Sequence, residues 1–331
     1  MTHYNIPVFV PHLGCPHDCV FCNQKKITGN EKPFMTEDAK HIIEEHLKTI
    51  EKNKDRFVEI AFFGGSFTAI DDDIFKKLCL LGKKYIDEKK VNALRCSTRP
   101  DLIDNEKLKF MKKCGFDTIE LGVQSTDDTV LLKSGRGHTK EAVFDAAKKI
   151  KEENLKLGLQ MMIGLPFDTE EKTLKTAKDI ISLNPDCVRV YPTLTIEGTK
   201  LYSMYENKEY MPWELEKTVD VLSKVLSLFY ENNINVVRVG LQTTDNINEK
   251  TVIGPYHPSI REMAESIIYR NKIEKLTLNS NLTVFVNDKE ISKAIGNKKS
   301  NILYFKEKYG ITIDIKGDKS IKKGDIKAVR K

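Results

Sequence analysis

Short apolar runs alternate with helical patterns over the first 240 residues of the chain. The strand candidates are Tyr4–Val10, Val58–Phe63, Asn92–Ser97, Asp117–Val123, Lys156–Ile163 and Cys187–Tyr191. Between them lie patterns such as Ala39, Ile42, Ile43, Leu47 and Ile50, which place the apolar side chains on one face of a helix. Six repeats of strand then helix predict a parallel sheet, because parallel neighbours need a helical crossover. Such a sheet is either doubly wound or wrapped into a full or partial barrel.

Polar or glycine-rich segments follow five successive strand candidates. They are the cysteine-containing segment that begins at Cys15, Gly64-Gly65-Ser66, Ser97-Thr98-Arg99, Gln124-Ser125 and Gly164-Leu165-Pro166. In both kinds of parallel sheet the chemistry collects at the carboxyl ends of the strands. Five such segments in series therefore predict a single functional rim.

A second pattern begins after Tyr191. It predicts, in order, a helix at Trp213–Tyr230, a strand at Val236–Gly240, a turn at Gly254–Pro258, a strand at Leu282–Val286, a helix at Asp288–Ile295, a loop at Gly296–Lys299, a helix at Ser300–Tyr309 and a strand at Ile311–Ile315. We expect a large core domain at residues 1–250, a connecting segment at 251–280 and a small C-terminal module at 281–331.

The composition is that of a soluble globular protein. The chain has 331 residues, of which 40% are apolar and 31% charged, and this length suggests about two domains of roughly 150 residues each. No apolar run approaches the ~18 residues of a membrane span, and the start lacks the features of a secretory signal. We therefore expect a cytoplasmic protein.

The net charge of +6 belongs to the C-terminal end. Residues 287–331 hold 13 Lys and Arg against 6 Asp and Glu, which leaves the rest of the chain at −1. A basic end of this kind indicates either a polyanionic partner or a solvated lysine-rich face.

Three of the seven cysteines, Cys15, Cys19 and Cys22, fall within eight residues. Without an export signal, a metal or redox site is favoured over disulfides. A cube of four irons held by three thiolates keeps one iron open to a small molecule. Structural zinc normally needs four ligands, and His17 is poorly placed between two cysteines to be the fourth. Buried apolar positions are expected for the other four cysteines, which are Cys79, Cys96, Cys114 and Cys187.

The segment Cys15–Cys22, with an aromatic residue before the third cysteine, resembles the cluster motif of the radical S-adenosylmethionine (SAM) superfamily. Within that superfamily the chain resembles the radical domain of the elongator catalytic subunit and coproporphyrinogen dehydrogenase. The residues beyond that domain are too few for the acetyltransferase domain of the elongator subunit. The other matching stretches are Phe62–Phe67, Ser97–Asp101, Glu120–Ser125, Gly135–Thr139 and Met162–Pro166.

The resemblance implies a partial TIM-type (β/α)6 barrel with a [4Fe-4S] cluster on Cys15, Cys19 and Cys22. It also implies that SAM chelates the open iron and is cleaved to a 5′-deoxyadenosyl radical. An electron donor such as flavodoxin or ferredoxin is implied as a partner.

The resemblance also assigns SAM contacts. Gly64, Gly65 and Ser66 would face the methionine amino group, and Arg136 its carboxylate, which suits a guanidinium. Ser97, Gln124 and Gln160 would bind the ribose hydroxyls. The adenine would lie between Ile163-Gly164 and Val190-Tyr191. Gln160 departs from the family, where this position is often Asp.

Several of these residues have plainer interpretations that the sequence leaves open. Gly64-Gly65 also fits an ordinary turn, and Arg136 a solvated surface charge. Glu120 fits a structural ion pair, and Tyr256 with His257 fits a pinned turn better than a contact with the site.

The C-terminal pattern resembles the β-α-α-β core of a KH domain, which clamps single-stranded nucleic acid with a Gly-x-x-Gly loop. The corresponding loop is Gly296, Asn297, Lys298 and Lys299. It departs from that motif because Lys299 replaces the second glycine. A small α/β cap with a solvated lysine face is the alternative.

We therefore expect a radical SAM enzyme that modifies RNA, either tRNA or rRNA, with the basic module tethering the RNA near the catalytic mouth. The first alternative is a radical SAM enzyme acting on a small molecule such as a tetrapyrrole or a cofactor precursor. The second is a non-catalytic iron–sulfur protein that binds RNA.

Overall fold

The structure is a computed structural model that describes residues 2–10, 15, 18–22, 35–50, 55–241, 248–276 and 280–330. Its central feature is a seven-stranded parallel sheet with the strand order β1-β2-β3-β4-β5-β6-β8. The strands are β1 (Thr2–Val10), β2 (Arg56–Gly64), β3 (Ala93–Thr98), β4 (Phe116–Gln124), β5 (Lys156–Ile163), β6 (Cys187–Pro192) and β8 (Asn235–Val239).

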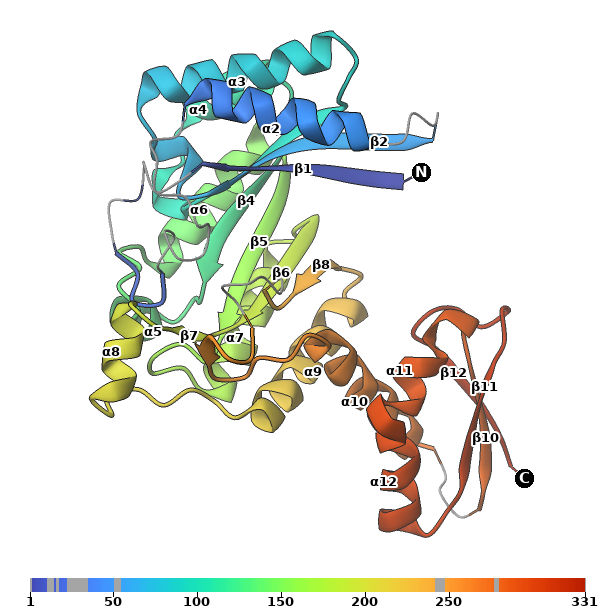
Figure 1. The fold of residues 1–331 in the computed structure, drawn as a ribbon. Helices are drawn as coiled ribbons and strands as arrows, with labels where there is room; N and C mark the ends of the chain where they lie inside the picture. The colour runs from blue at the N-terminus through green and yellow to red at the C-terminus, as the bar shows by residue number, and fades with distance from the viewer. Residues whose placement is uncertain are drawn as a thin grey trace.

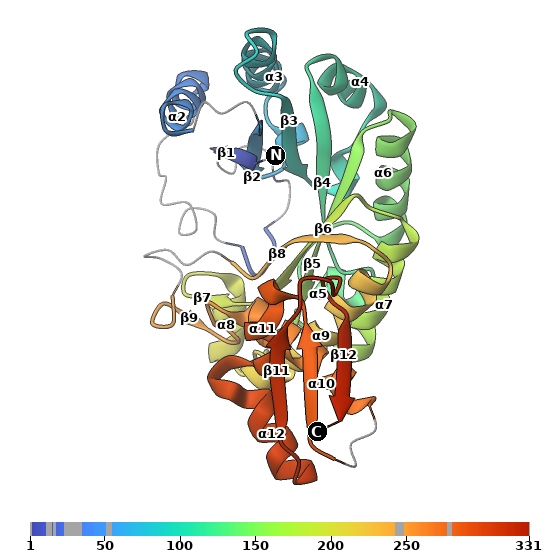
Figure 2. The same ribbon diagram turned by 90° about the vertical axis from the view of Figure 1, so that its right-hand side faces the viewer.

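The sheet curls into an incomplete barrel with helices on its outer face (Figures 1 and 2). The helices that connect its strands are α2 (Thr36–Thr49), α3 (Asp72–Asp87), α4 (Asn105–Lys113), α5 (Asp128–Lys133), α6 (Lys140–Glu152), α7 (Glu170–Ser182), α8 (Lys200–Glu206) and α9 (Leu215–Glu231). Several begin at side-chain caps; for example, the Asp104 carboxylate accepts from the backbone N–H of Lys107 at 2.8 Å.

This architecture confirms the predicted partial barrel and extends it by one strand. The strand expected at Val236–Gly240 is β8, which pairs in parallel with β6 and forms the second edge of the sheet. A two-stranded ribbon, β7 (Thr195–Ile196) with β9 (Val252–Ile253), was not predicted. None of the helices in the described part of the chain has the length and apolar character needed to cross a bilayer.

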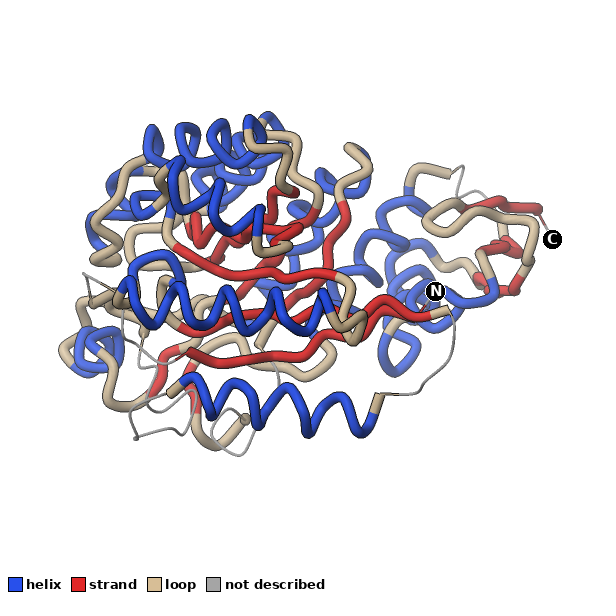
Figure 3. Tube along the Cα trace, turned by 90° about the horizontal axis from the view of Figure 1, so that it is seen from above, coloured by secondary structure: helices blue, strands red, loops and turns tan. Residues whose placement is uncertain are grey.

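The C-terminal module is a three-stranded mixed sheet with two helices on one side. Strand β10 (Leu282–Val286) pairs in parallel with β11 (Ile313–Gly317) and antiparallel with β12 (Ile326–Arg330). Helices α11 (Ile291–Ile295) and α12 (Ser300–Tyr309) lie between β10 and β11 in the chain. The predicted β-α-α-β order is therefore confirmed, while β12 was not predicted. Figure 3 shows this module as a separate lobe beside the barrel.

Helix α10 (Ile260–Glu274) joins the two lobes and is buried in both. Its residues Ile260 and Ala264 belong to the barrel core, whereas Tyr269 and Ile273 belong to the core of the C-terminal module. The expected connecting segment is therefore a packed helix, and the domain limits drawn from the sequence stay a prediction.

Candidate active site at the barrel rim

All seven strands of the barrel run in the same direction, so their carboxyl ends meet at one edge. Strand β2 ends at Gly64, β3 at Thr98, β4 at Gln124 and β5 at Ile163. The segments that the sequence placed on one rim therefore lie along one edge of the sheet.

Gly64 lies where β2 passes close to β1. Its φ is +118°, and a Cβ there would lie 2.2 Å from the Val10 carbonyl oxygen. The next residue, Gly65, donates its N–H to the same oxygen at 3.2 Å. The glycine at 64 is therefore required by the neighbouring strand. Beside it, Ser66 is buried, with its hydroxyl 3.5 Å from the Cys15 sulfur.

Gln124 is held in a strained conformation at the end of β4. Its φ is +65°, and the ladder with β5 shifts register between Gly122 and Gln124. A register irregularity of this kind re-aims a side chain, and left-handed backbone at a non-glycine residue is typical of functional positions. The buried Gln124 Oε1 has no hydrogen-bond partner among the described residues.

Arg136 is 6% exposed, so its interpretation as a solvated surface charge is wrong. Its Nη1 donates to the Cys19 sulfur at 3.2 Å and its Nη2 to the Gly122 carbonyl. The Nε is buried without a partner among the described residues. The guanidinium thus lies between the cysteine segment and β4, and its Nε–H is left for another acceptor.

Arg99 supports Arg136, and sequence reasoning did not single it out. It pairs with both carboxylate oxygens of Asp101, at 3.0 and 3.1 Å. Its Nη2 also donates to the Arg136 backbone carbonyl, and its Nη1 is buried and unpartnered within the described residues. Nearby, burial and the charge of Arg136 lower the pKa of His138 to about 3, so this imidazole is neutral at pH 7.

The unpartnered atoms fit the chemistry of SAM. The Nε of Arg136 and the Nη1 of Arg99 are donors suited to a carboxylate, and the Gln124 Oε1 accepts from a hydroxyl. The predicted contacts of Arg136 and Gln124 with SAM are therefore compatible with these buried atoms. For the predicted adenine contacts, the structure shows that Ile163 and Val190 are buried and that their carbonyls accept from Thr193 and Gly240. The adenine contacts stay a prediction.

The structure describes all three cluster cysteines, and Cys22 donates its backbone N–H to the Cys19 carbonyl at 3.0 Å. Among the residues it describes, no three His, Cys, Asp or Glu side chains are grouped closely enough to hold a metal ion. The predicted ligand set rests on the spacing of the thiols, and it stays a prediction. His17, the alternative zinc ligand, lies outside the described residues.

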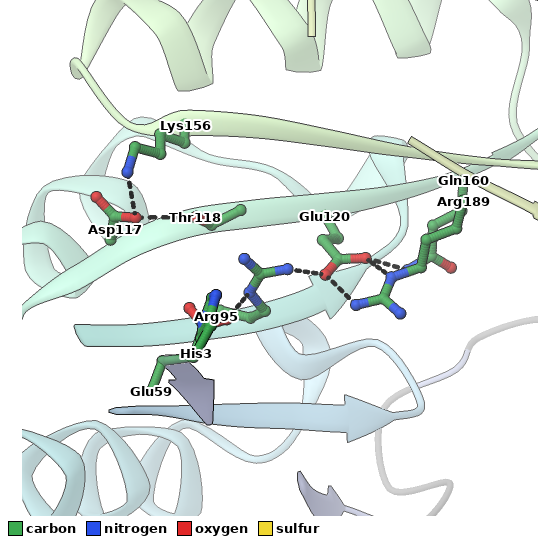
Figure 4. Close-up of polar contacts among 9 residues, drawn as sticks. All are labelled: His3, Glu59, Arg95, Asp117, Thr118, Glu120, Lys156, Gln160 and Arg189. Atoms are coloured by element: carbon green, nitrogen blue, oxygen red, sulfur yellow. Dashed lines mark hydrogen bonds and ion pairs between the residues drawn. The ribbon is translucent and has the colours of Figure 1, made fainter. Parts of the chain in front are cut away.

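Behind the rim, a chain of buried charges crosses the barrel interior (Figure 4). Glu120 on β4 accepts from Arg95 at 2.7 Å and from Arg189 at 2.6 and 3.0 Å. Arg95 also pairs with Glu59 at 2.9 Å. Burial alone would raise the pKa of Glu120, but the two arginines lower it. Glu120 is therefore an ion-pair partner, which is the structural role that the sequence left open for it.

Gln160 and Ser97 belong to the same network. The Gln160 amide nitrogen lies 2.9 Å from Glu120 Oε2 and 3.1 Å from Ser97 Oγ. Two of the three residues predicted to bind the ribose are thus in mutual contact.

The plainer interpretations hold elsewhere. The His257 Nδ1 accepts from the Ser259 N–H at 3.0 Å, so this ring pins a turn. The four remaining cysteines are buried, as predicted, and burial raises the pKa of Cys187 to about 11.

The loop between α11 and α12 is exposed and basic. Residues Asn297, Lys298 and Lys299 are exposed, and both lysines are in the left-handed region, with φ of 51° and 63°. Gly296 has φ +80°, and a Cβ there would lie 2.3 Å from the Ser300 hydroxyl. The two lysines therefore project from a tight turn whose first residue must be glycine.

The Radical SAM superfamily matches residues 9–180 of the chain, and the Radical_SAM C-terminal domain matches residues 185–270. The tRNA uridine(34) acetyltransferase of Methanocaldococcus jannaschii is 31% identical over 65% of this chain, which spans 47% of that protein. The heme chaperone HemW of Bacillus subtilis is 24% identical over 70% of the chain and 64% of its own length.

Among solved structures, the fold is similar to that of the archaeal Methanocaldococcus infernus Elp3 with an N-terminal deletion. The TM-score is 0.64 at 24% identity, over 82% of this chain and 63% of that one. The chain therefore belongs to the radical SAM superfamily of enzymes, a membership that implies a [4Fe-4S] cluster and SAM as cofactors.

Proposed function

We propose that this radical SAM enzyme modifies RNA, with tRNA as the substrate class. The observation that carries the proposal is the loop at Gly296–Lys299, in which the exposed Lys298 and Lys299 lie between two short helices. A loop of this kind brings positive charge and helix backbone close to phosphates. The archaeal relative named as a tRNA uridine(34) acetyltransferase supports tRNA over other RNAs.

In this proposal Arg136 holds the SAM carboxylate, and Gly64, Gly65 and Ser66 face its amino group. The bidentate geometry of a guanidinium fixes the orientation of a carboxylate as well as binding it. Arg99 holds the Arg136 backbone in place through its carbonyl. These residues would fix the methionine end of SAM beside the cysteine segment.

Gln124, Gln160 and Ser97 bind the ribose, and backbone near Ile163 and Val190 borders the adenine. Cys15, Cys19 and Cys22 hold the cluster. When bound, the cluster and SAM supply a 5′-deoxyadenosyl radical that abstracts hydrogen from the substrate. The role of the protein side chains is to orient SAM and to exclude water from the hydrogen-bond donors at the rim.

The radical chemistry is tested with anaerobically reconstituted protein, a reductant and SAM. We expect the wild-type protein to release 5′-deoxyadenosine. The Cys19→Ala variant should lose both this release and the iron–sulfur absorbance. Arg136→Lys keeps the charge but loses the fork, so SAM affinity should fall about tenfold. No release from wild-type protein with an intact cluster would reject the radical function.

The RNA proposal is tested by measuring tRNA binding against salt. The affinity should fall steeply as salt rises, and Lys298→Glu and Lys299→Glu should weaken it and reduce the salt slope. Lys178→Glu, an equal charge change on the exposed face of α7, is the matched control. Equal binding by the loop variants and wild type would reject the loop as the RNA site.

A second candidate, a function in handling a tetrapyrrole such as haem, is favoured by the similarity to the heme chaperone HemW. Comparison of tRNA nucleosides by mass spectrometry, from cells with and without the gene, separates the two. A nucleoside missing from the deletion strain supports RNA modification. An unchanged nucleoside set together with haem binding by the purified protein supports the second candidate.

A further inference from the structure

The buried network around Glu120 fixes the orientation of one amide at the rim. Glu120 is 1% exposed, and its carboxylate takes hydrogen bonds from Arg95, Arg189 and Gln160. These three partners come from β3, β6 and β5, so the carboxylate joins three strands to its own strand, β4 (Figure 4).

The chemistry of these groups determines which end of the Gln160 amide faces inward. An ionised carboxylate only accepts hydrogen bonds, and the two arginines keep Glu120 ionised by lowering its pKa. The amide nitrogen of Gln160 must therefore face Glu120. The same nitrogen contacts the Ser97 hydroxyl at 3.1 Å, so both of its N–H groups have partners.

The network uses the amide nitrogen of Gln160, so the side-chain carbonyl oxygen is available to accept from another partner. We propose that Glu120 is a positioning residue that makes Gln160 an acceptor towards the ribose of SAM. Gln160 thereby accepts from a ribose hydroxyl, which is a donor. This inference rests on the proposed function, in which Gln160 contacts SAM.

The same geometry explains why a neutral amide stands at position 160. A carboxylate there would lie about 3 Å from the Glu120 carboxylate, in the place now taken by the amide nitrogen, and two like charges in a buried site repel strongly. Gln160 supplies an acceptor oxygen to the rim without that repulsion. The identity of residue 160 is thus coupled to the identity of residue 120.

The coupling is tested by exchanging the two side chains. Gln160→Glu puts two carboxylates in contact, and Glu120→Gln lets the amide of Gln160 turn its nitrogen towards the rim. Each single variant should bind SAM about tenfold more weakly, the equivalent of one hydrogen bond. The exchange variant, with both substitutions, restores one carboxylate and one amide and should recover most of the affinity.

Glu120→Asp keeps a negative charge beside both arginines but withdraws it from Gln160. It should also weaken SAM binding, and it replaces Glu120→Gln if that variant does not fold. Glu59→Gln is the control, since Glu59 pairs with Arg95 and His3, whereas Gln160 contacts Glu120 and Ser97. It removes a buried carboxylate without disturbing the amide, so its SAM affinity should stay near that of wild type.

The measurement is SAM titration by calorimetry on anaerobic, reconstituted protein, with thermal unfolding of each variant recorded in parallel. An exchange variant that binds no better than the weaker single variant would overturn the inference, as would equal losses in Glu59→Gln and Glu120→Asp. If wild-type protein itself does not bind SAM, the proposed function fails instead.

Discussion

Replacing Lys299 by glycine should make the C-terminal module more stable and its RNA binding weaker. Lys299 directly precedes α12 with φ of 63° and ψ of 29°. Left-handed backbone costs a residue with a side chain about 1–2 kcal/mol, whereas glycine adopts it freely. Glycine also raises the entropy of the unfolded chain, which lowers the free energy of unfolding by about 0.5–1 kcal/mol. The net gain expected for Lys299→Gly is therefore about 0.5–1 kcal/mol.

Amide hydrogen exchange in α12 and β10 measures this change inside the module, apart from unfolding of the barrel. Lys306→Gly is the matched control, since Lys306 is an exposed lysine within α12. Glycine there should destabilise the module by about 1 kcal/mol, because the backbone is helical. The slowest exchanging amides should be better protected in Lys299→Gly and less protected in Lys306→Gly.

RNA binding should move in the opposite direction. Lys299→Gly removes one positive charge, so the slope of log affinity against log salt should fall by about one. A more stable module that binds tRNA less tightly would show that the strained lysine is retained for its charge. Equal or lower protection in Lys299→Gly would refute the assignment of strain, and unchanged affinity would refute the role of the charge.

Two further substitutions test the rim. Gly64→Ala brings a methyl group against the Val10 carbonyl at positive φ, so we expect a loss of at least about 3 kcal/mol in urea unfolding. Gly310→Ala, also at positive φ but with open space around it, should lose only about 1 kcal/mol, and equal losses would contradict the close approach. In the unfolded state His138 binds a proton below pH ~6.5. In the folded state burial lowers its pKa to about 3, so the imidazole stays neutral down to about that pH. Wild-type stability should therefore fall by about 1 kcal/mol more than that of His138→Gln between pH 7.0 and 5.5, and parallel pH profiles would contradict the burial.

The fold was largely predictable because its strands and crossover helices follow two simple periods. The sequence pattern was less informative for two elements, helix α10 and strand β12. Helix α10 buries Ala264 in the barrel and Ile273 in the module, so its apolar residues form no single stripe. Strand β12 is an edge strand of five residues, Ile-Lys-Ala-Val-Arg, and it lacks the strict alternation of apolar and polar residues that marks a half-buried strand.

The sequence named candidate residues for the rim but did not show which side chains contact one another. Arg95, Glu120 and Arg189 each stand between two apolar neighbours in their strands, and that irregularity was the available signal. Strand periodicity does not reveal which charge meets which, because three different strands bring them together. The hydrogen bond from Arg99 to the Arg136 carbonyl likewise joins residues 37 positions apart in the chain.

The junction between the two lobes changes how the C-terminal module would deliver RNA. A flexible tether would raise the local concentration of bound RNA in all directions around the barrel. The structure instead has Glu265 of α10, buried at 5% exposure, accepting from Tyr230 of α9 at 2.7 Å and pairing with Lys293 of α11 at 2.7 Å. One carboxylate therefore links the last barrel helix to the module.

This link predicts delivery in a fixed direction. Glu265→Gln should weaken the junction and leave the loop at Gly296–Lys299 unaltered, so tRNA affinity should persist. If the direction of delivery matters, turnover on tRNA should fall while release of 5′-deoxyadenosine without RNA stays near the wild-type rate. Equal turnover in wild type and Glu265→Gln would show that a loose tether suffices.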